Sequence, residues 1–93
     1  MEQTNGKNQS QMMQTFVNEL PQLRKAINIS QTDLGGRLGL SRQTISSIER
    51  GEVPMTWAVY VAAVTFFQGN QSEDELTQIT DHWAYISDFM KGR

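Results

Sequence analysis

The chain has 93 residues, a hydrophobic content of 38% and a net charge of −2, which together indicate one small globular domain. It contains no cysteine, and this excludes a disulfide framework and a thiolate metal site. No apolar run approaches the roughly 18 residues of a membrane span, so we expect a cytoplasmic protein without membrane contact.

The charges are distributed unevenly along the chain. Residues 20–50 carry five basic and two acidic side chains, whereas residues 51–93 carry two basic and six acidic ones. A basic module followed by an acidic segment can orient a molecule toward a polyanion without making its whole surface adhesive. The difference is small, and ordinary scatter of surface charges would also produce it.

The N-terminal part predicts a tail and a long helix. Residues 1–10 are rich in Gln, Asn and Ser, and we expect them to be disordered. Apolar residues then recur at spacings of three and four from Met13 to Ile27, which predicts a helix. Pro21 either kinks this helix or begins a second one in its first turn, and a single kinked helix is slightly favoured. Asn28 can end it in the left-handed conformation.

Two short helices separated by a tight turn follow. Ser30 is a suitable N-cap for the first, which ends at Gly39. Ser41 is a suitable N-cap for the second, from Arg42 to about Arg50, and Gly51 ends it. Two short helices joined by a turn that contains glycine are typical of a helix-turn-helix.

Two further helices complete an all-α pattern of about five helices. Thr56 caps an apolar helix from Trp57 to about Gln68, and a capping box at Ser72 begins a fifth helix. The apolar seam of this fifth helix comprises Leu76, Ile79, Trp83, Ile86 and Met90. The seam either covers the core or forms a dimer contact, and we favour the cover because a small domain needs the buried area. We therefore expect a helix-turn-helix domain over residues 11–70, with its motif at about 30–51, and a C-terminal helix within residues 71–93.

The helix over residues 42–50 has a narrow apolar edge and a polar remainder. At 100° per residue, Ile45 and Ile48 centre the apolar edge. The opposite side and the flanks are polar, and they comprise Arg42, Gln43, Thr44, Ser46, Ser47 and Arg50. Arginine can bind guanine, glutamine can bind adenine, and the threonine methyl group can contact thymine. For this helix alone, an ordinary solvated face is the alternative.

Three neighbouring features favour DNA binding over a solvated face. Gly35 is placed where two crossing helices come closest. Glu49 lies at the margin of the isoleucine edge and Arg24 at the margin of the first helix's apolar stripe, so these two either form one ion pair or both reach solvent. Gln31 begins a helix, where backbone N–H groups favour a phosphate. Gly36, next to Gly35, has no comparable role that would explain a glycine there.

Residues 29–52, ISQTDLGGRLGLSRQTISSIERGE, resemble the Cro/repressor-type helix-turn-helix family, also called the xenobiotic-response-element type. The resemblance extends upstream to Leu23-Arg24-Lys25. It implies a compact five-helix bundle of the lambda-repressor-like type. It also implies binding of double-stranded DNA through the second motif helix, in a homodimer on a palindromic operator.

The resemblance also implies roles for individual residues. Arg42, Gln43 and Ser47 match base-reading positions, and Ser46 joins them on the helical wheel. Gln31 matches a phosphate-binding glutamine, and Thr44 and Arg50 lie where the DNA backbone is contacted. Arg24 and Glu49 match the family's buried ion pair. The sequence departs from the family pattern at Gly35, Gly36 and Glu52 and in its unusually apolar fourth helix.

These patterns predict a sequence-specific transcriptional regulator, in particular a repressor. The alternative is a protein-binding module, such as an antitoxin-like partner, that uses the fourth or fifth helix. We expect no enzymatic activity, cofactor or metal site, because His82 is the single histidine and no cysteine is present.

Overall fold

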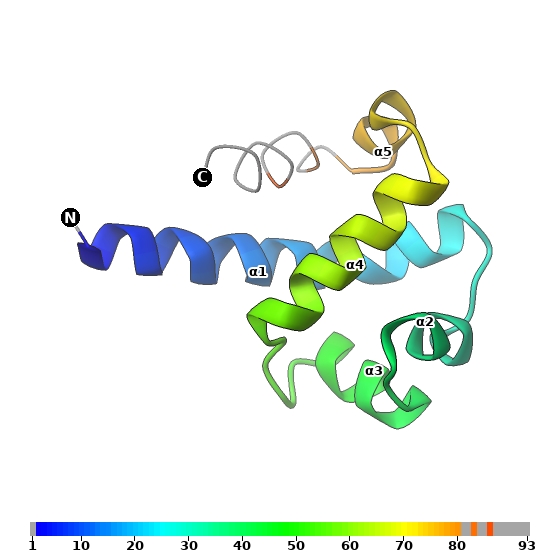
Figure 1. Ribbon diagram of the computed structural model, residues 1–93, viewed down its shortest axis with the longest axis horizontal. Coiled ribbons are helices and arrows are strands. Elements are labelled where there is room, and N and C mark those ends of the chain that lie inside the picture. The colour runs from blue at the N-terminus through cyan, green and yellow to red at the C-terminus, as the bar shows by residue number, and fades with distance from the viewer. Residues whose placement is uncertain (1, 81–82, 84–85, 87–93) are drawn as a thin grey trace.

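Residues 2–80, 83 and 86 are described by the computed structural model, with side chains from residue 10 onward (Figure 1). Over these residues the chain forms five helices and no strand, in a compact all-α fold, as predicted. The helices are α1 (Glu2–Ala26), α2 (Gln31–Leu38), α3 (Arg42–Glu49), α4 (Trp57–Asn70) and α5 (Glu73–Ile79).

The helix boundaries follow local side-chain chemistry. The hydroxyl groups of Ser30, Ser41, Thr56 and Ser72 each accept the backbone N–H of the residue three positions later. These are the four predicted N-caps, and each satisfies a donor that the first helical turn leaves unpaired. The predicted left-handed residue Asn28 has φ 60°, and it ends α1 as expected.

The first helix is longer than predicted. It begins at Glu2 and is continuous through Pro21, so the alternative of two separate helices is wrong. The structure extends this helix over residues 2–10, where the sequence predicts a tail. Extending an existing helix needs no new nucleus.

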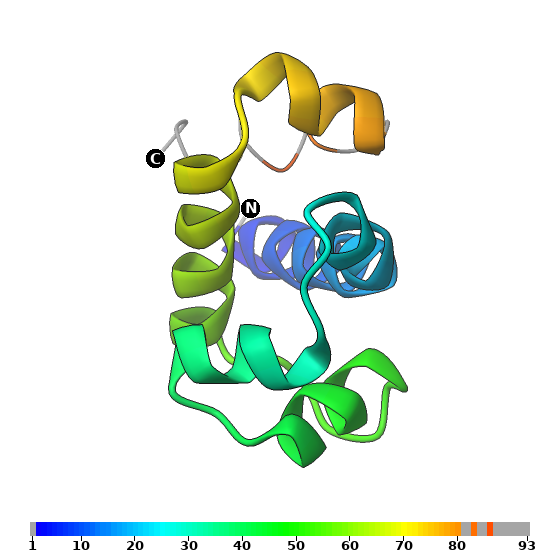
Figure 2. The same cartoon turned by 90° about the vertical axis from the view of Figure 1, so that its right-hand side faces the viewer.

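The core lies where α1 meets the other helices. Figure 2 shows α1 almost end-on, with α4 beside it, α5 above, and α2 and α3 below. The ring of Phe16 on α1 lies 5.4 Å from the ring of Tyr60 and 6.3 Å from that of Phe67, both on α4, measured between ring centroids. These edge-on aromatic contacts join the two longest helices.

The predicted fifth helix is interrupted at Thr80. This residue is extended, with φ −140° and ψ 135°, a conformation that suits a β-branched side chain. The amide of Gln22 on α1 donates to the carbonyl of Ile79 at 3.0 Å. Leu76, Trp83 and Ile86 are fully buried in the core, as a covering segment requires, and Met90 lies outside the described residues.

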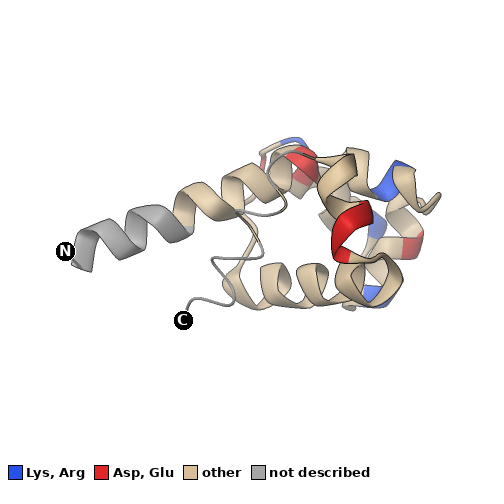
Figure 3. Cartoon of the chain, turned by 90° about the horizontal axis from the view of Figure 1, so that it is seen from above, with Lys and Arg blue, Asp and Glu red and all other residues tan. Residues whose placement is uncertain are grey.

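The fourth helix is apolar, as expected, and it contains no charged residue. It is tan throughout in Figure 3, where charged residues are blue or red. Four of its side chains are buried, but Trp57 at its start is 39% exposed and stacks on Tyr60. No helix in the described part of the chain combines the length and apolarity needed to span a membrane.

Candidate nucleic-acid interface

The inner edge of α3 fixes this helix to the rest of the domain. Ile45 and Ile48 are buried in the core, as the helical wheel predicts. Arg42 and Gln43 are exposed and Ser47 is half-buried. The helix is therefore attached along one edge and presents polar side chains on another.

The close approach of α2 to the turn before α3 depends on Gly35. A methyl group at this position would overlap the carbonyl oxygen of Leu40, which is backbone and cannot rotate away. The carbonyl of Gly35 also accepts the N–H of Leu40 at 2.8 Å. Gly36 is exposed, and a Cβ there would meet no atom within 4 Å. The need for a residue without a Cβ at Gly35 therefore agrees with the packing, but the close contact is with the backbone of the turn and not, as predicted, between two crossing helices.

Arg24 and Glu49 form a bidentate ion pair between α1 and α3. Arg24 Nε donates to Glu49 Oε2 at 2.7 Å, and Nη2 donates to Oε1 at 3.0 Å. Their side chains are only 14% and 7% exposed. Arg24 Nη1 also donates to the carbonyl of Ile29 at 3.2 Å, so the same guanidinium group binds the segment that leads into α2. Such bidentate geometry fixes the relative orientation of the two side chains as well as the distance between them.

Gln31 joins this network. Its Nε2 atom donates to Glu49 Oε1 at 2.9 Å, and the side chain is half-buried. A glutamine amide carries two N–H donors, so the bond to Glu49 uses one of them and orients the other. The residue expected to bind a phosphate is thus held by the same carboxylate that holds α3.

Arg42 lies in an electrostatically unfavourable place for the helix itself. It is the first residue of α3, which has no acidic residue in its first turn. The N-terminus of a helix carries partial positive charge, so a cation there opposes the helix dipole. Arg42 therefore does not serve the stability of α3, and contact with an external anion or base would explain its position.

The structure corrects the assignment of Ser46. This side chain is only 9% exposed, and its hydroxyl oxygen accepts a hydrogen bond from Nη1 of Arg50, one turn later. A wheel drawn for one helix places Ser46 on the polar side but cannot show a long side chain folding back over it. Ser46 is therefore unsuited to direct base contact.

Arg50 is also bound by Glu52 across Gly51. Arg50 Nε and Nη2 each donate to a different carboxylate oxygen of Glu52 at 2.9 Å. The hydrogen bonds and charge of Arg50 lower the pKa of Glu52, and the same pair raises the pKa of Arg50. Both side chains remain more than half exposed. Glu52 stands out in the sequence as a departure from the family pattern, but the sequence does not predict its direct pairing with Arg50.

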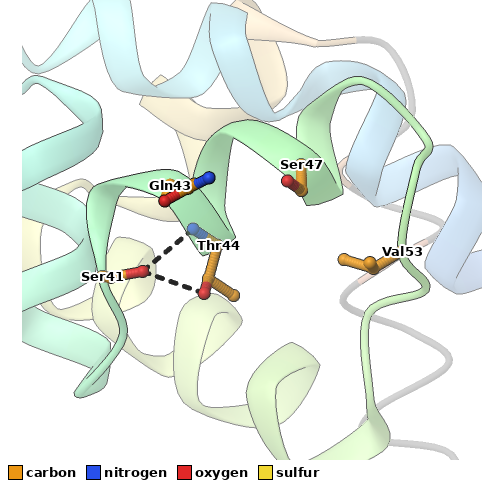
Figure 4. Close-up of a pocket in the computed structure, with 5 residues that line it drawn as sticks. All are labelled: Ser41, Gln43, Thr44, Ser47 and Val53. Carbon is orange, nitrogen blue, oxygen red and sulfur yellow. Dashed lines mark hydrogen bonds between the residues drawn. The ribbon is translucent and has the colours of Figure 1, made fainter.

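A hollow of about 190 Å³ opens beside α3. Figure 4 shows its lining residues, which are Ser41, Gln43, Thr44, Ser47 and Val53. The hydroxyl groups of Ser41 and Thr44 share a hydrogen bond of 2.9 Å, and Ser41 also accepts the N–H of Thr44. Sequence reasoning missed Val53, and an apolar residue directly after the motif was the available signal.

The described residues contain no group of three acidic or histidine side chains arranged to hold a metal ion. His82, the histidine considered in the sequence, lies outside the described residues.

The fold and this surface define a helix-turn-helix module with its second helix presented outward. The family model described as a helix-turn-helix domain matches residues 15–76. This match spans more than half of the chain, and the chain belongs to the helix-turn-helix domain family. In general terms it is a DNA-binding regulator of a typically non-enzymatic family. Comparison with curated proteins and with solved structures gave no match.

Proposed function

We propose that this protein is a sequence-specific transcriptional repressor of the Cro/repressor type. In this proposal it works in the cytoplasm as a homodimer, and each copy inserts α3 into the major groove of one half of a palindromic operator. The observation that best supports this proposal is that α3 has a buried attachment edge and carries the outward-facing residues Arg42 and Gln43. Repression requires only that the operator be occupied, and a domain of this size can do that.

Base reading is assigned to Arg42, Gln43 and Ser47. Arginine can bind the O6 and N7 atoms of guanine, and glutamine can bind N6 and N7 of adenine. The small side chain of Ser47 allows α3 to approach the base edges. Because the Arg24–Glu49 pair fixes α3 to α1, the helix that carries these side chains keeps one orientation relative to the domain.

Phosphate contacts are assigned to Gln31, Thr44 and Arg50. Gln31 retains a second amide N–H for a phosphate oxygen. Thr44 lies near the start of α3, where backbone dipoles favour an anion. Arg50 can reach a phosphate only by sharing or leaving Glu52, so its contribution should be smaller than that of a free arginine.

Selection of duplexes from a random pool, followed by a salt series on the enriched site, tests this proposal. Phosphate contacts predict a steep fall of affinity with rising salt. Gln31→Ala should weaken binding to all sequences alike, whereas Gln68→Ala on α4 should leave binding unchanged. Failure to enrich any site, or a flat salt response, would contradict DNA recognition.

A protein-binding role for α4 remains the second candidate. It is favoured by the exposed Trp57 at the start of an uncharged helix, since aromatic residues are enriched at protein interfaces. Tight binding of a protein partner together with a flat salt response on DNA would favour this role. An antitoxin-like regulator would combine both activities.

A further inference from the structure

The exposed Val53 is held in a fixed place beside the outward face of α3. Its side chain is 42% exposed. The N–H groups of Glu52 and Val53 both donate to the carbonyl of Ser47, at 2.8 Å and 3.4 Å. The loop after α3 is therefore fastened to the last turn of that helix, and Val53 keeps a defined position relative to Ser47.

The hollow beside α3 is lined by the apolar side chain of Val53, by the methyl group of Thr44 and by polar side chains. Val53 lies on one side of it, and Thr44 lies toward the other (Figure 4). Because the hydroxyl of Thr44 is bound to Ser41, its methyl group points away from Ser41, toward the side where Val53 lies (Figure 4). Gln43 and Ser47, two of the proposed base readers, complete the lining.

We propose that this hollow receives the 5-methyl group of a pyrimidine in the major groove, with Val53 as the main contact. This inference rests on the proposed function and adds a specificity-determining residue outside α3. The polar lining residues would orient neighbouring base edges, and Val53 and the Thr44 methyl group would enclose the pyrimidine methyl.

The chemistry of the major groove supports this occupant. An exposed valine gains by burial only against another apolar group. The base edges in the major groove are donors and acceptors, apart from the C5-methyl group of thymine. Cytosine methylated at C5 presents the same group. Gln43 and Ser47 line the same hollow, so a base read by these residues would lie next to Val53.

The test uses the duplex selected from a random pool and measures its affinity for the full chain. Each thymine is replaced in turn by uracil, which removes only the 5-methyl group. Each cytosine is replaced in turn by 5-methylcytosine. The same duplexes are bound to Val53→Ala and to Val53→Thr, which preserves the shape of valine but replaces one methyl group with a hydroxyl.

We expect removal of one methyl group to weaken wild-type binding about fourfold, the effect of exposing roughly one methylene. Both Val53 variants should lose this discrimination and bind the two duplexes equally. A loss with uracil assigns the methyl group to thymine, and a gain restricted to 5-methylcytosine assigns it to methylated cytosine; either supports the proposal.

Two results would overturn the proposal, and they differ in what else they reject. If a site is enriched but neither replacement changes wild-type affinity, or if Val53→Ala keeps the full effect, the methyl site is wrong and DNA recognition stands. If no site is enriched, the proposed function fails together with the methyl site. Because Val53 is exposed, unchanged thermal unfolding of both variants provides the folding control.

Discussion

Two arginine–glutamate pairs flank the C-terminal end of α3, and they differ chiefly in burial. Arg24 and Glu49 are 14% and 7% exposed, whereas Arg50 and Glu52 are 54% and 57% exposed. Both pairs are bidentate. The inner pair joins elements 25 residues apart in sequence, while the outer pair joins residues two positions apart. The same chemistry therefore fixes the fold on one side of α3 and adjusts surface charge on the other.

Burial explains this division of roles. Removing one partner of a buried pair leaves an uncompensated charge in a poorly solvated place, which is costly. An exposed partner is solvated by water and screened by salt, so its loss has little effect on folding. Substitutions on the two sides of α3 should thus separate stability from DNA binding.

The largest expected effect is the loss of the inner carboxylate. Glu49→Ala removes the acceptor of two Arg24 bonds and of the Gln31 bond, and it should reduce the free energy of unfolding by about 3–5 kcal/mol. Urea denaturation followed by circular dichroism measures this loss. Glu52→Ala, three residues later, is the matched control and should leave the unfolding free energy nearly unchanged. Equal losses in the two variants would contradict the comparison.

The two adjacent glycines of α2 offer a second contrast between inner and outer positions. Gly35→Ala forces a methyl group against the Leu40 carbonyl and should destabilise the domain by about 1–3 kcal/mol. Gly36→Ala meets no atom within 4 Å and should stabilise α2 by up to about 1 kcal/mol. Thermal unfolding of both variants tests whether their melting temperatures shift in opposite directions. A shift in the same direction for both would mean that α2 packs differently.

Substitutions on the outward-facing side of α3 should affect DNA binding and leave stability unchanged. Arg42→Ala and Gln43→Ala should each cost about 1–3 kcal/mol of binding to the selected site and relax base preference. Neither should lower the melting temperature, because both side chains are exposed. Competition between the selected duplex and single-base variants measures the preference, with Gln68→Ala as the control. Retention of full base preference would show that other residues read the bases.

The features that could be predicted from the sequence depend on the chemistry of neighbouring residues or on which face of a helix a residue occupies. The caps at Ser30 and Ser41 need a hydroxyl three residues before an N–H, and the Ile45/Ile48 edge needs only helical periodicity. The Arg24–Glu49 pair was predictable because both residues lie at the margins of apolar stripes. Each of these rules needs only the periodicity of one helix or the facing sides of two helices.

The features that were missed depend on how side chains fold across turns. The Ser46 hydroxyl is hydrogen-bonded by Arg50, which reaches back by one turn, and Arg50 also pairs with Glu52 across Gly51, which has φ 78°. The break at Thr80 is likewise invisible to a pattern that continues through Trp83 and Ile86. Helical periodicity specifies which faces are apolar, but it does not specify where the backbone leaves the helix to bury them.

The smallest expected effect tests whether Glu52 restrains Arg50. Glu52→Gln removes the carboxylate that binds the Arg50 guanidinium, so Arg50 becomes free to contact a phosphate. Affinity for the selected duplex should rise, and the plot of log affinity against log salt should steepen by about one unit, as expected for one additional phosphate contact. Glu73→Gln, at the start of α5, makes the same change in net charge away from α3. If both variants raised affinity equally, net charge rather than release of Arg50 would be responsible.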